Sequence, residues 1–254
     1  MTEKAAGEET FISHLIELRD RLVKASIGIA IITAALMLWP GPSHIYDFIA
    51  RPMIASLPVG SKMIATGVIA PFLVPMKVTL LIAFILSLPW VFYQLWAFIA
   101  PGLYAHEKKL VLPLVVSSSL LFMGGVAFCY FFVFGRVFKF IGDFAPSSIA
   151  VTPDIENYLD FVMSMCLAFG ATFEVPVVVV ILVRMGIVSV AKLKEIRPYA
   201  IVGAFVIAAI VTPPDIVSQF SLALPMWLLF ELGLLVAPVF VRATQAPNEQ
   251  PDND

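Results

Sequence analysis

Charged side chains are scarce in this sequence. Only 13% of its 254 residues are Asp, Glu, Lys or Arg, whereas 60% are hydrophobic. A soluble domain is about 25% charged and about 45–50% apolar, so this chain has too few charges to cover a folded core with a water-exposed surface. A soluble globular enzyme and a disordered protein are therefore excluded. The net charge of −2 also lacks the positive field that binds nucleic acid.

Cysteine and histidine are rare as well. Cys129 and Cys166 lie inside apolar runs, where a thiol behaves as a small hydrophobe, and they supply neither a disulfide framework nor a zinc site. His14, His44 and His106 lie in polar connectors and form no cluster. The GxxxxGK[ST], HExxH and GxSxG motifs do not occur. We therefore expect no enzyme activity, no metal and no cofactor.

Long uncharged runs are what the sequence does contain. They predict an all-α integral membrane protein, because a helix needs about 20 apolar residues to cross the hydrocarbon core. We expect one six-helix transmembrane domain over residues 1–241 and a disordered cytoplasmic tail at 242–254, which is rich in Pro, Gln, Asn and Asp. The expected spans are 22–40, 77–99, 110–135, 158–183, 199–211 and 216–240.

The fifth and sixth spans are expected to be short. Residues 199–211 end at Thr212-Pro213-Pro214, and at ~1.5 Å per residue they reach about 20 Å, against ~30 Å for the hydrocarbon core. From Ile216, 15 uncharged residues precede Glu231. Two short spans joined by a tight turn indicate a local weakness in the membrane barrier or shelter against other helices.

Basic residues predict the orientation of the chain. Eleven of the 16 Lys and Arg residues fall on one side of the expected spans. These are Lys4, Arg19, Arg21, Lys24, Lys108, Lys109, Arg184, Lys192, Lys194, Arg197 and Arg242. The other side has Arg51, Lys62, Arg136 and Lys139, with Lys77 at the edge of the second span. Both termini are therefore expected in the cytoplasm.

Residues 11–22 predict an amphipathic N-terminal helix at the cytoplasmic interface, leading into the first span. Its apolar residues recur at i, i+4, i+7 and i+11, on one face of a helix. They are Phe11, Leu15, Leu18 and Leu22.

Two acids lie closest to the membrane on this otherwise basic side. Glu17 either pairs with Arg21 four residues later or is available to a guest. Glu107 either stabilises the start of the third span through the helix dipole or, like Glu17, is available to bind a guest peptide. Two carboxylates in this position can accept bidentate hydrogen bonds from the guanidinium groups of a bound peptide.

Three further polar residues need an explanation. Glu174 lies near the middle of the fourth span, where a carboxyl group costs roughly 2.5–3.5 kcal/mol or more to insert. It is either a functional acid or a protonated carboxyl bonded to a neighbouring helix. Asp215 either caps the sixth span or contacts a partner, and Gln219, one turn further, is a candidate for pairing with another transmembrane helix.

Five segments together resemble one family, TatC, the multispanning subunit of the twin-arginine protein translocase. They occur in the family's order between residues 11 and 219. They are SHLIELRDRL (13–22), AFIAPGLY (97–104) followed by Glu107, FEVP (173–176), RPY (197–199), and TPPD (212–215) followed by Ser218 and Gln219.

The resemblance implies a cupped, glove-like bundle of six transmembrane helices in the bacterial cytoplasmic membrane. The implied function is that of the core receptor subunit, which binds twin-arginine signal peptides of folded proteins at the cytoplasmic face. Export then requires the single-span partners TatB and TatA and the proton-motive force. The resemblance also implies self-association in a larger complex, in contact with membrane lipid.

The resemblance further implies roles for individual residues. The signal-peptide site would comprise Glu17, Glu107, Arg19, Leu22 and Phe98. Glu174 would face the concave interior of the bundle. Pro52, Asp215 and Gln219 would serve assembly or contact partner helices. One departure concerns Met63-Ile64-Ala65-Thr66, which the family often follows with an acid and this chain follows with Gly67.

A secondary transporter of a small solute, with Glu174 as the intramembrane coupling acid, is the alternative. Such proteins usually contain inverted repeats and several ionisable groups near the midplane. Residues 11–130 and 131–241 show no such repeat, and Glu174 is the one clear midplane charge of the sequence.

Overall fold

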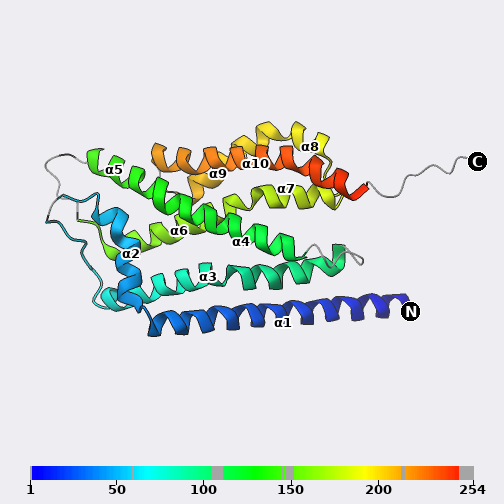
Figure 1. Ribbon diagram of the computed structural model, residues 1–254, viewed down its shortest axis with the longest axis horizontal. Coiled ribbons are helices and arrows are strands. Elements are labelled where there is room, and N and C mark those ends of the chain that lie inside the picture. The colour runs from blue at the N-terminus through cyan, green and yellow to red at the C-terminus, as the bar shows by residue number, and fades with distance from the viewer. Residues whose placement is uncertain are drawn as a thin grey trace, which may run out of the picture. The chain divides into compact units, whose positions relative to one another are not determined.

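A computed structural model describes residues 2–58, 60–103, 111–144, 146, 152–212 and 215–245. Within these residues the protein is helical, apart from one isolated β-bridge between Ile64 and Asp154. The elements are α1 (Thr2–Leu38), α2 (Pro42–Ile54), α3 (Ala70–Leu103), α4 (Val111–Phe128), the π-helical turn η2 (Cys129–Val133), α5 (Phe134–Phe144), α6 (Ile155–Phe173), α7 (Val175–Arg184), α8 (Val190–Glu195), α9 (Arg197–Val211) and α10 (Ile216–Gln245) (Figure 1). The predicted all-α class is confirmed.

Five described stretches are long and apolar enough to cross a membrane, and α9 is a shorter sixth. The five are Ile12–Leu38, Ala70–Ile99, Val111–Phe144, Ile155–Arg184 and Ile216–Pro238. The short fifth span is confirmed, because α9 has only 15 residues. The amphipathic segment at 11–22 is continuous with the first span, since both belong to α1.

The prediction of a short sixth span is wrong. The apolar part of α10 covers 23 residues, Ile216–Pro238, and the helix passes through Glu231 without a break. Arg197 donates from Nη2 to Glu231 Oε2 at 2.8 Å, so the acid has a counter-charge and does not end the span. Pro225 and Pro238 also lie inside α10, as proline does in membrane helices whose freed carbonyls find other partners.

Two further differences from the predicted segments are a helix between the first two spans and a longer last helix. Residues 42–54 form α2, which the hydropathy did not predict because the helix is short and contains Pro52. Its Ile45 and Ile49 are one turn apart and are both buried. At the other end, α10 continues to Gln245, so residues 242–245 are helical rather than part of a disordered tail. The rest of that predicted tail lies outside the described residues.

The helices form two compact units, one of Met1–Ala50 with Gly67–Ser119 and one of Arg51–Thr66 with Leu120–Asp254. In the first unit α1 and α3 lie side by side (Figure 1). Trp90 of α3 packs against Gly28 of α1, where a Cβ would lie 2.8 Å from the indole Nε1. The same Nε1 donates to the carbonyl of Lys24 at 2.9 Å. Only glycine at position 28 leaves room for this contact.

In the second unit α10 packs against α7, α9 and α6. Gly233 of α10 allows close approach to α7, because a Cβ there would lie 3.0 Å from Val179 Cβ and 3.1 Å from Pro176 Cα. Small residues permit such contacts in membranes, where packing replaces the hydrophobic driving force between helices. A cluster of aromatic rings fills the remaining core of this unit, with Phe134 and Phe169 fully buried.

Candidate functional site

The N-terminal half of α1 carries the first predicted site residue, Glu17. Arg21 donates to Glu17 Oε1 from Nε at 2.9 Å and from Nη2 at 2.7 Å. The local i,i+4 pair is therefore formed. Both nitrogens bind the same oxygen, and within the described part of the chain Oε2 accepts no hydrogen bond. The Glu17 side chain is 37% exposed and that of Arg21 24%, so the second oxygen is open to a further donor.

Phe98 of α3 lies close to the same face of α1. Its ring stacks on that of His14, with centroids 4.4 Å apart and an interplanar angle of 20°. At about 100° per residue, Glu17 is within about 60° of His14 on the helix. Phe98 therefore contacts His14 and lies near the face of α1 that carries Glu17. No role was predicted for His14, and nothing in its sequence spacing to Phe98 indicates this contact.

Arg19 and Leu22 lie on other parts of α1. Arg19 is about 140° around the helix from His14 and binds its neighbour Asp20, with Nη2 2.8 Å from Oδ1. The Leu22 side chain is 65% exposed. Neither residue joins the stacked face, so a ligand that touches them and Glu17 must wrap around α1. Glu107, the second predicted acid, lies outside the described residues.

Glu174 lies at the joint between α6 and α7. It is the C-cap of α6 and the N-cap of α7, and its N–H donates to the carbonyl of Ala171 at 3.1 Å. Pro176, in the first turn of α7, has no N–H and cannot continue the α6 hydrogen-bond ladder. The break therefore sets a half-buried carboxyl group inside the apolar stretch Ile155–Arg184.

Asp215 caps the start of α10. Its Oδ1 accepts from the N–H of Ser218 at 2.7 Å, and its carbonyl accepts from the N–H of Gln219 at 3.1 Å. Its other oxygen, Oδ2, is buried and has no donor among the residues that the structure describes. The capping alternative is thus observed, and Oδ2 is left as an acceptor for a group outside the described chain.

The ion pair between Arg197 and Glu231 was not predicted. It joins the first residue of α9 to the middle of α10 at 2.8 Å, across 34 residues of sequence. Both side chains are partly buried, with exposures of 43% and 24%. Arg197 stood in one of the family-like segments, but its partner depends on how α9 packs on α10, which the sequence does not give.

Asp154 fastens the segment before Gly67 to the start of α6. Its Oδ2 accepts from the Thr66 hydroxyl at 2.7 Å and from the Thr66 N–H at 3.0 Å. Its Oδ1 caps α6 by accepting from Glu156 N–H at 2.9 Å and Asn157 N–H at 3.1 Å. The Thr66 hydroxyl, then these N–H groups, lower the pKa of Asp154, because they stabilise the carboxylate form.

Comparison with known proteins identifies relatives along most of the chain. The family model of the Sec-independent protein translocase protein (TatC) matches residues 13–225. TatC of Escherichia coli K12 is 49% identical over 233 residues, which are 92% of this chain and 90% of that protein. TatC of Halothiobacillus neapolitanus is 49% identical over 240 residues, 94% of this chain. This chain spans 65% of the length of that second relative.

Solved structures of the same kind share the fold. A crystal structure of the twin-arginine translocase receptor TatC superposes with a TM-score of 0.76 at 34% identity, covering 89% of this chain and 98% of that one. A second crystal structure of that receptor, in the detergent DDM, gives a TM-score of 0.78 at 34% identity and covers 88% and 99% of the two chains.

Proposed function

Because the chain belongs to the TatC family of Sec-independent protein translocase proteins, we propose that it binds twin-arginine signal peptides at the inner end of α1 and α3. TatC proteins are the receptor subunits of the twin-arginine translocase. They are not a family of catalytic enzymes. The small-solute transporter is not supported, since the relatives are components of a protein translocase.

The proposal is supported above all by the Glu17 carboxylate, because only one of its two oxygens accepts hydrogen bonds from Arg21. Arg21 demonstrates that a guanidinium group fits against Glu17 with two N–H donors on Oε1, while Oε2 has no donor in the described chain. A partly exposed i,i+4 pair contributes only about 0.3–0.5 kcal/mol, so a guest arginine displaces or joins Arg21 at little cost. A planar guanidinium gains more from a carboxylate than an ammonium group does.

The other site residues extend this contact. Glu107 would receive the second arginine of the pair, and Phe98 would pack against the apolar residues of the signal peptide. Arg19 and Leu22 would contact the peptide where it wraps around α1. The stack of His14 on Phe98 supports this role, because it fixes the ring next to the Glu17 face.

The membrane setting follows the charge pattern. The chain is a multi-pass protein of a bacterial translocase, and we place it in the cytoplasmic membrane with both termini inside, where most of its basic residues then lie. Export would draw on the proton-motive force. The half-buried Glu174, at the joint of α6 and α7, would line the path of the guest, and the 15-residue α9 would thin the barrier beside it.

The partners would be single-span TatB and TatA, with self-association in a larger complex. Two helices present apolar side chains for this contact. These are Tyr199, Val202, Val206 and Ile210 on α9, and Phe220, Leu224, Leu228 and Leu232 on α10, all exposed in the isolated chain. The buried Oδ2 of Asp215 would accept a hydrogen bond from a partner, with Gln219 one turn away. Pro52 of α2 would act in assembly.

The test of the signal-peptide site is site-specific cross-linking. Membranes containing Glu17→Gln, Glu107→Gln or the double variant are exposed to a twin-arginine peptide with a photo-reactive group. Each single variant should lower the yield at least tenfold, because a neutral amide loses the charge-assisted bonds. Glu195→Gln, which neutralises an acid in the exposed pair with Lys192 on α8, is the matched control. Undiminished cross-linking in the double variant, with normal membrane insertion, would refute the site.

A further inference from the structure

Gln94 of α3 is a polar side chain inside an apolar membrane helix. It is only 4% exposed, and its amide group makes no hydrogen bond with any other residue that the structure describes. Trp96, two residues later and about 160° around the helix, differs in this respect, because its Nε1 donates to Ser118 Oγ at 3.3 Å. Buried polar groups nearly always have a partner, since an unsatisfied one is costly. The Gln94 amide is therefore available to a group outside the described chain.

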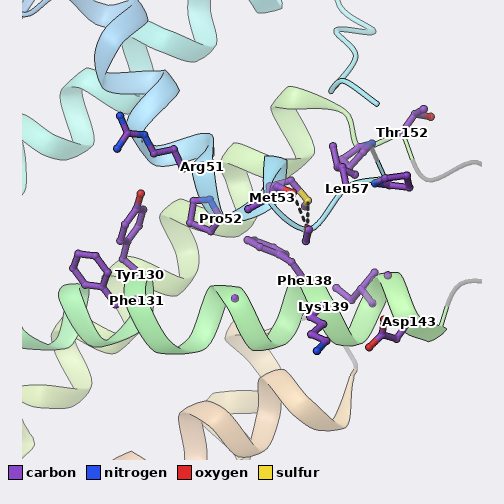
Figure 2. Close-up of a pocket in the computed structure, with 17 residues that line it drawn as sticks. Arg51, Pro52, Met53, Leu57, Tyr130, Phe131, Phe138, Lys139, Asp143 and Thr152 are labelled. Atoms are coloured by element: carbon purple, nitrogen blue, oxygen red, sulfur yellow. Dashed lines mark hydrogen bonds between the residues drawn. The ribbon is translucent and has the colours of Figure 1, made fainter. Parts of the chain in front are cut away.

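The polar groups of a cavity in the second unit are different. This cavity has a volume of ≈ 1050 Å³ and lies between the end of α2 and the stretch η2–α5 (Figure 2). Ser56 Oγ in its wall donates to the carbonyl of Met53 at 2.7 Å, and Arg51 acts electrostatically on Tyr130. These groups interact within the chain, whereas the Gln94 amide does not, so Gln94 is the stronger indication of an external ligand.

Two contacts between α1 and α3 define the position of Gln94. Phe98, one turn later on α3, stacks on His14, and Trp90, one turn earlier, donates to the carbonyl of Lys24 at 2.9 Å. At about 100° per residue, Trp90 and Phe98 each lie about 40° from Gln94 around α3. Gln94 therefore faces α1, midway between these two contacts.

Glu17 and Arg21 lie on the facing part of α1. Both fall between His14 and Lys24 in the sequence, and Arg21 is about 20° from His14 around the helix. The Arg21 side chain is 24% exposed, which agrees with this position. Packed helices have axes about 8–10 Å apart, a distance that two opposing long side chains span together. The Gln94 carbonyl oxygen and Glu17 Oε2, neither of which accepts a hydrogen bond within the described chain, are thus at the same level of the two helices.

These two acceptors suit a guanidinium group. A guanidinium has five N–H donors in one plane, so it can bond to acceptors on two sides at once. A cation that bonds to Gln94 must lose most of its water, because the amide is almost completely buried. A guanidinium is more weakly hydrated than the ammonium group of lysine, so it loses this water at a lower cost. A contact with Gln94 therefore favours arginine over lysine.

We propose that Gln94 determines the specificity of the signal-peptide site for arginine. Its Oε1 accepts a hydrogen bond from the guanidinium group of one guest arginine, and another edge of the same group bonds to Glu17 Oε2. This role rests on the proposed function, because it requires the signal peptide to bind at Glu17. It adds a nearly buried neutral acceptor to the acids, and it explains how the site distinguishes arginine from positive charge in general.

The test is a comparison of peptide affinities. Labelled signal peptides with Arg-Arg, Arg-Lys, Lys-Arg or Lys-Lys at the twin position are titrated against the full-length protein in nanodiscs. Gln94→Met keeps the length and approximate volume of the side chain but removes the amide. It should weaken Arg-Arg binding about fivefold, the factor for one net hydrogen bond of about 1 kcal/mol, and Lys-Lys binding by less than about twofold. One mixed peptide should follow Arg-Arg and the other Lys-Lys, which identifies the arginine that contacts Gln94.

Two further variants separate this contact from other effects. Ser87→Ala removes a buried hydroxyl from the same face of α3, where Ser87 Oγ donates to the carbonyl of Phe84 at 2.8 Å, and it should leave all four affinities unchanged. Gln94→Met combined with Arg21→Gln should still show the loss of about fivefold, because the guest, and not Arg21, bonds to Gln94. Unchanged Lys-Lys binding in Gln94→Met would also show that the α1–α3 unit is folded.

A loss by the same factor for all four peptides would overturn the role of Gln94, because a structural defect does not distinguish arginine from lysine. A loss that disappears when Arg21 is absent, or Arg-Arg binding as strong as in the wild type, would overturn it as well. Glu17→Gln in the same titration tests the proposed function separately. Unchanged binding in Glu17→Gln would refute the signal-peptide site, whereas lost binding there with no effect of Gln94→Met would refute only the role of Gln94.

Discussion

The pair of Glu17 with Arg21 on α1 and the pair of Arg197 with Glu231 between α9 and α10 have almost the same geometry and different consequences. Their closest N–O distances are 2.7 and 2.8 Å. The first pair joins residues four apart on one helix, so the helix alone brings them together. The second joins residues 34 apart and exists only when α9 is packed on α10. The first is therefore suited to exchange, and the second to holding a short helix in place.

Burial reinforces this difference. Glu231 is 24% exposed within an apolar stretch that crosses the membrane, where an ionised carboxylate without a partner is costly. Glu17 is 37% exposed and lies only five residues from the N-terminal end of the apolar stretch Ile12–Leu38, where water and a guest peptide can reach it. An identical chemical group thus acts as a structural tie in one region and, in the proposed function, as a binding group in the other.

Glu231→Ala should have the largest effect on stability. It leaves the guanidinium group of Arg197 partly buried without its partner, and a lost hydrogen bond between charged groups costs about 1.5–3 kcal/mol of the free energy of unfolding. Denaturant or heat unfolding of the purified protein measures the change. Glu195→Ala is the control, because its pair with Lys192 is exposed and should contribute less than about 0.5 kcal/mol. Equal losses in the two variants would remove the distinction between the two kinds of pair.

Trp90→Phe should have the next largest effect. If the Glu17 pair contributes little, another contact must hold the inner part of α1 on α3, and the bond from Trp90 Nε1 to the Lys24 carbonyl at 2.9 Å is that contact. Its loss should cost about 0.5–1.5 kcal/mol, measured in the same unfolding assay. Trp227→Phe is the control, since its indole has no hydrogen bond within the described helices. A change of less than 0.3 kcal/mol relative to that control would contradict the role of Trp90.

Arg21→Gln should change stability by only about 0.3–0.5 kcal/mol and should strengthen binding of a twin-arginine peptide by about twofold, the same free energy expressed as affinity. The removed arginine competes with the guest for Glu17, so its loss favours the guest. A titration of labelled peptide against reconstituted protein measures the affinity, with Lys24→Gln as the charge-matched control. Weaker binding in Arg21→Gln than in that control would mean that Arg21 itself holds the peptide.

The long apolar runs made most of this fold predictable. The stretches around α3, α4, α6 and α9 carry their signal in composition alone, and Pro213 and Pro214 mark where α9 must end. The length of α10 was not predictable, because Glu231 counts as a charge in hydropathy and as half of a neutral pair in the folded chain. The α2 helix was missed for a related reason, since its burial at Ile45 and Ile49 depends on what packs against it.

The candidate site divides in the same way. Glu17 and Glu174 were identified because an acid in an apolar or basic setting is anomalous in the sequence itself. The stack of His14 on Phe98 was not, because ring contacts between helices depend on register and rotation. The role of Asp154 was also missed, although the capping position before Ile155 was a usable signal, since its second bond reaches back 88 residues to Thr66.

The smallest expected effect concerns pH and the local contact of Thr66 with Asp154. The Thr66 hydroxyl lowers the pKa of Asp154, so Asp154 binds more protons when the segment 61–66 is open than when it is closed. The contact is therefore fully present above the ordinary Asp pKa of about 3.9. It is lost as the pH falls through the lowered value. Hydrogen exchange of residues 61–66, read by mass spectrometry between pH 5 and pH 3 (about one unit on either side of that pKa), should show the opening. In Thr66→Ala the pKa rises toward its ordinary value, so opening should begin at higher pH, whereas Thr33→Ala, whose hydroxyl bonds only within α1, should leave it unchanged. Protection of these amides, taken relative to the exchange of an unfolded peptide at the same pH, that does not depend on pH in either protein would show that the backbone bonds of Ile64, rather than the carboxylate, hold the segment closed.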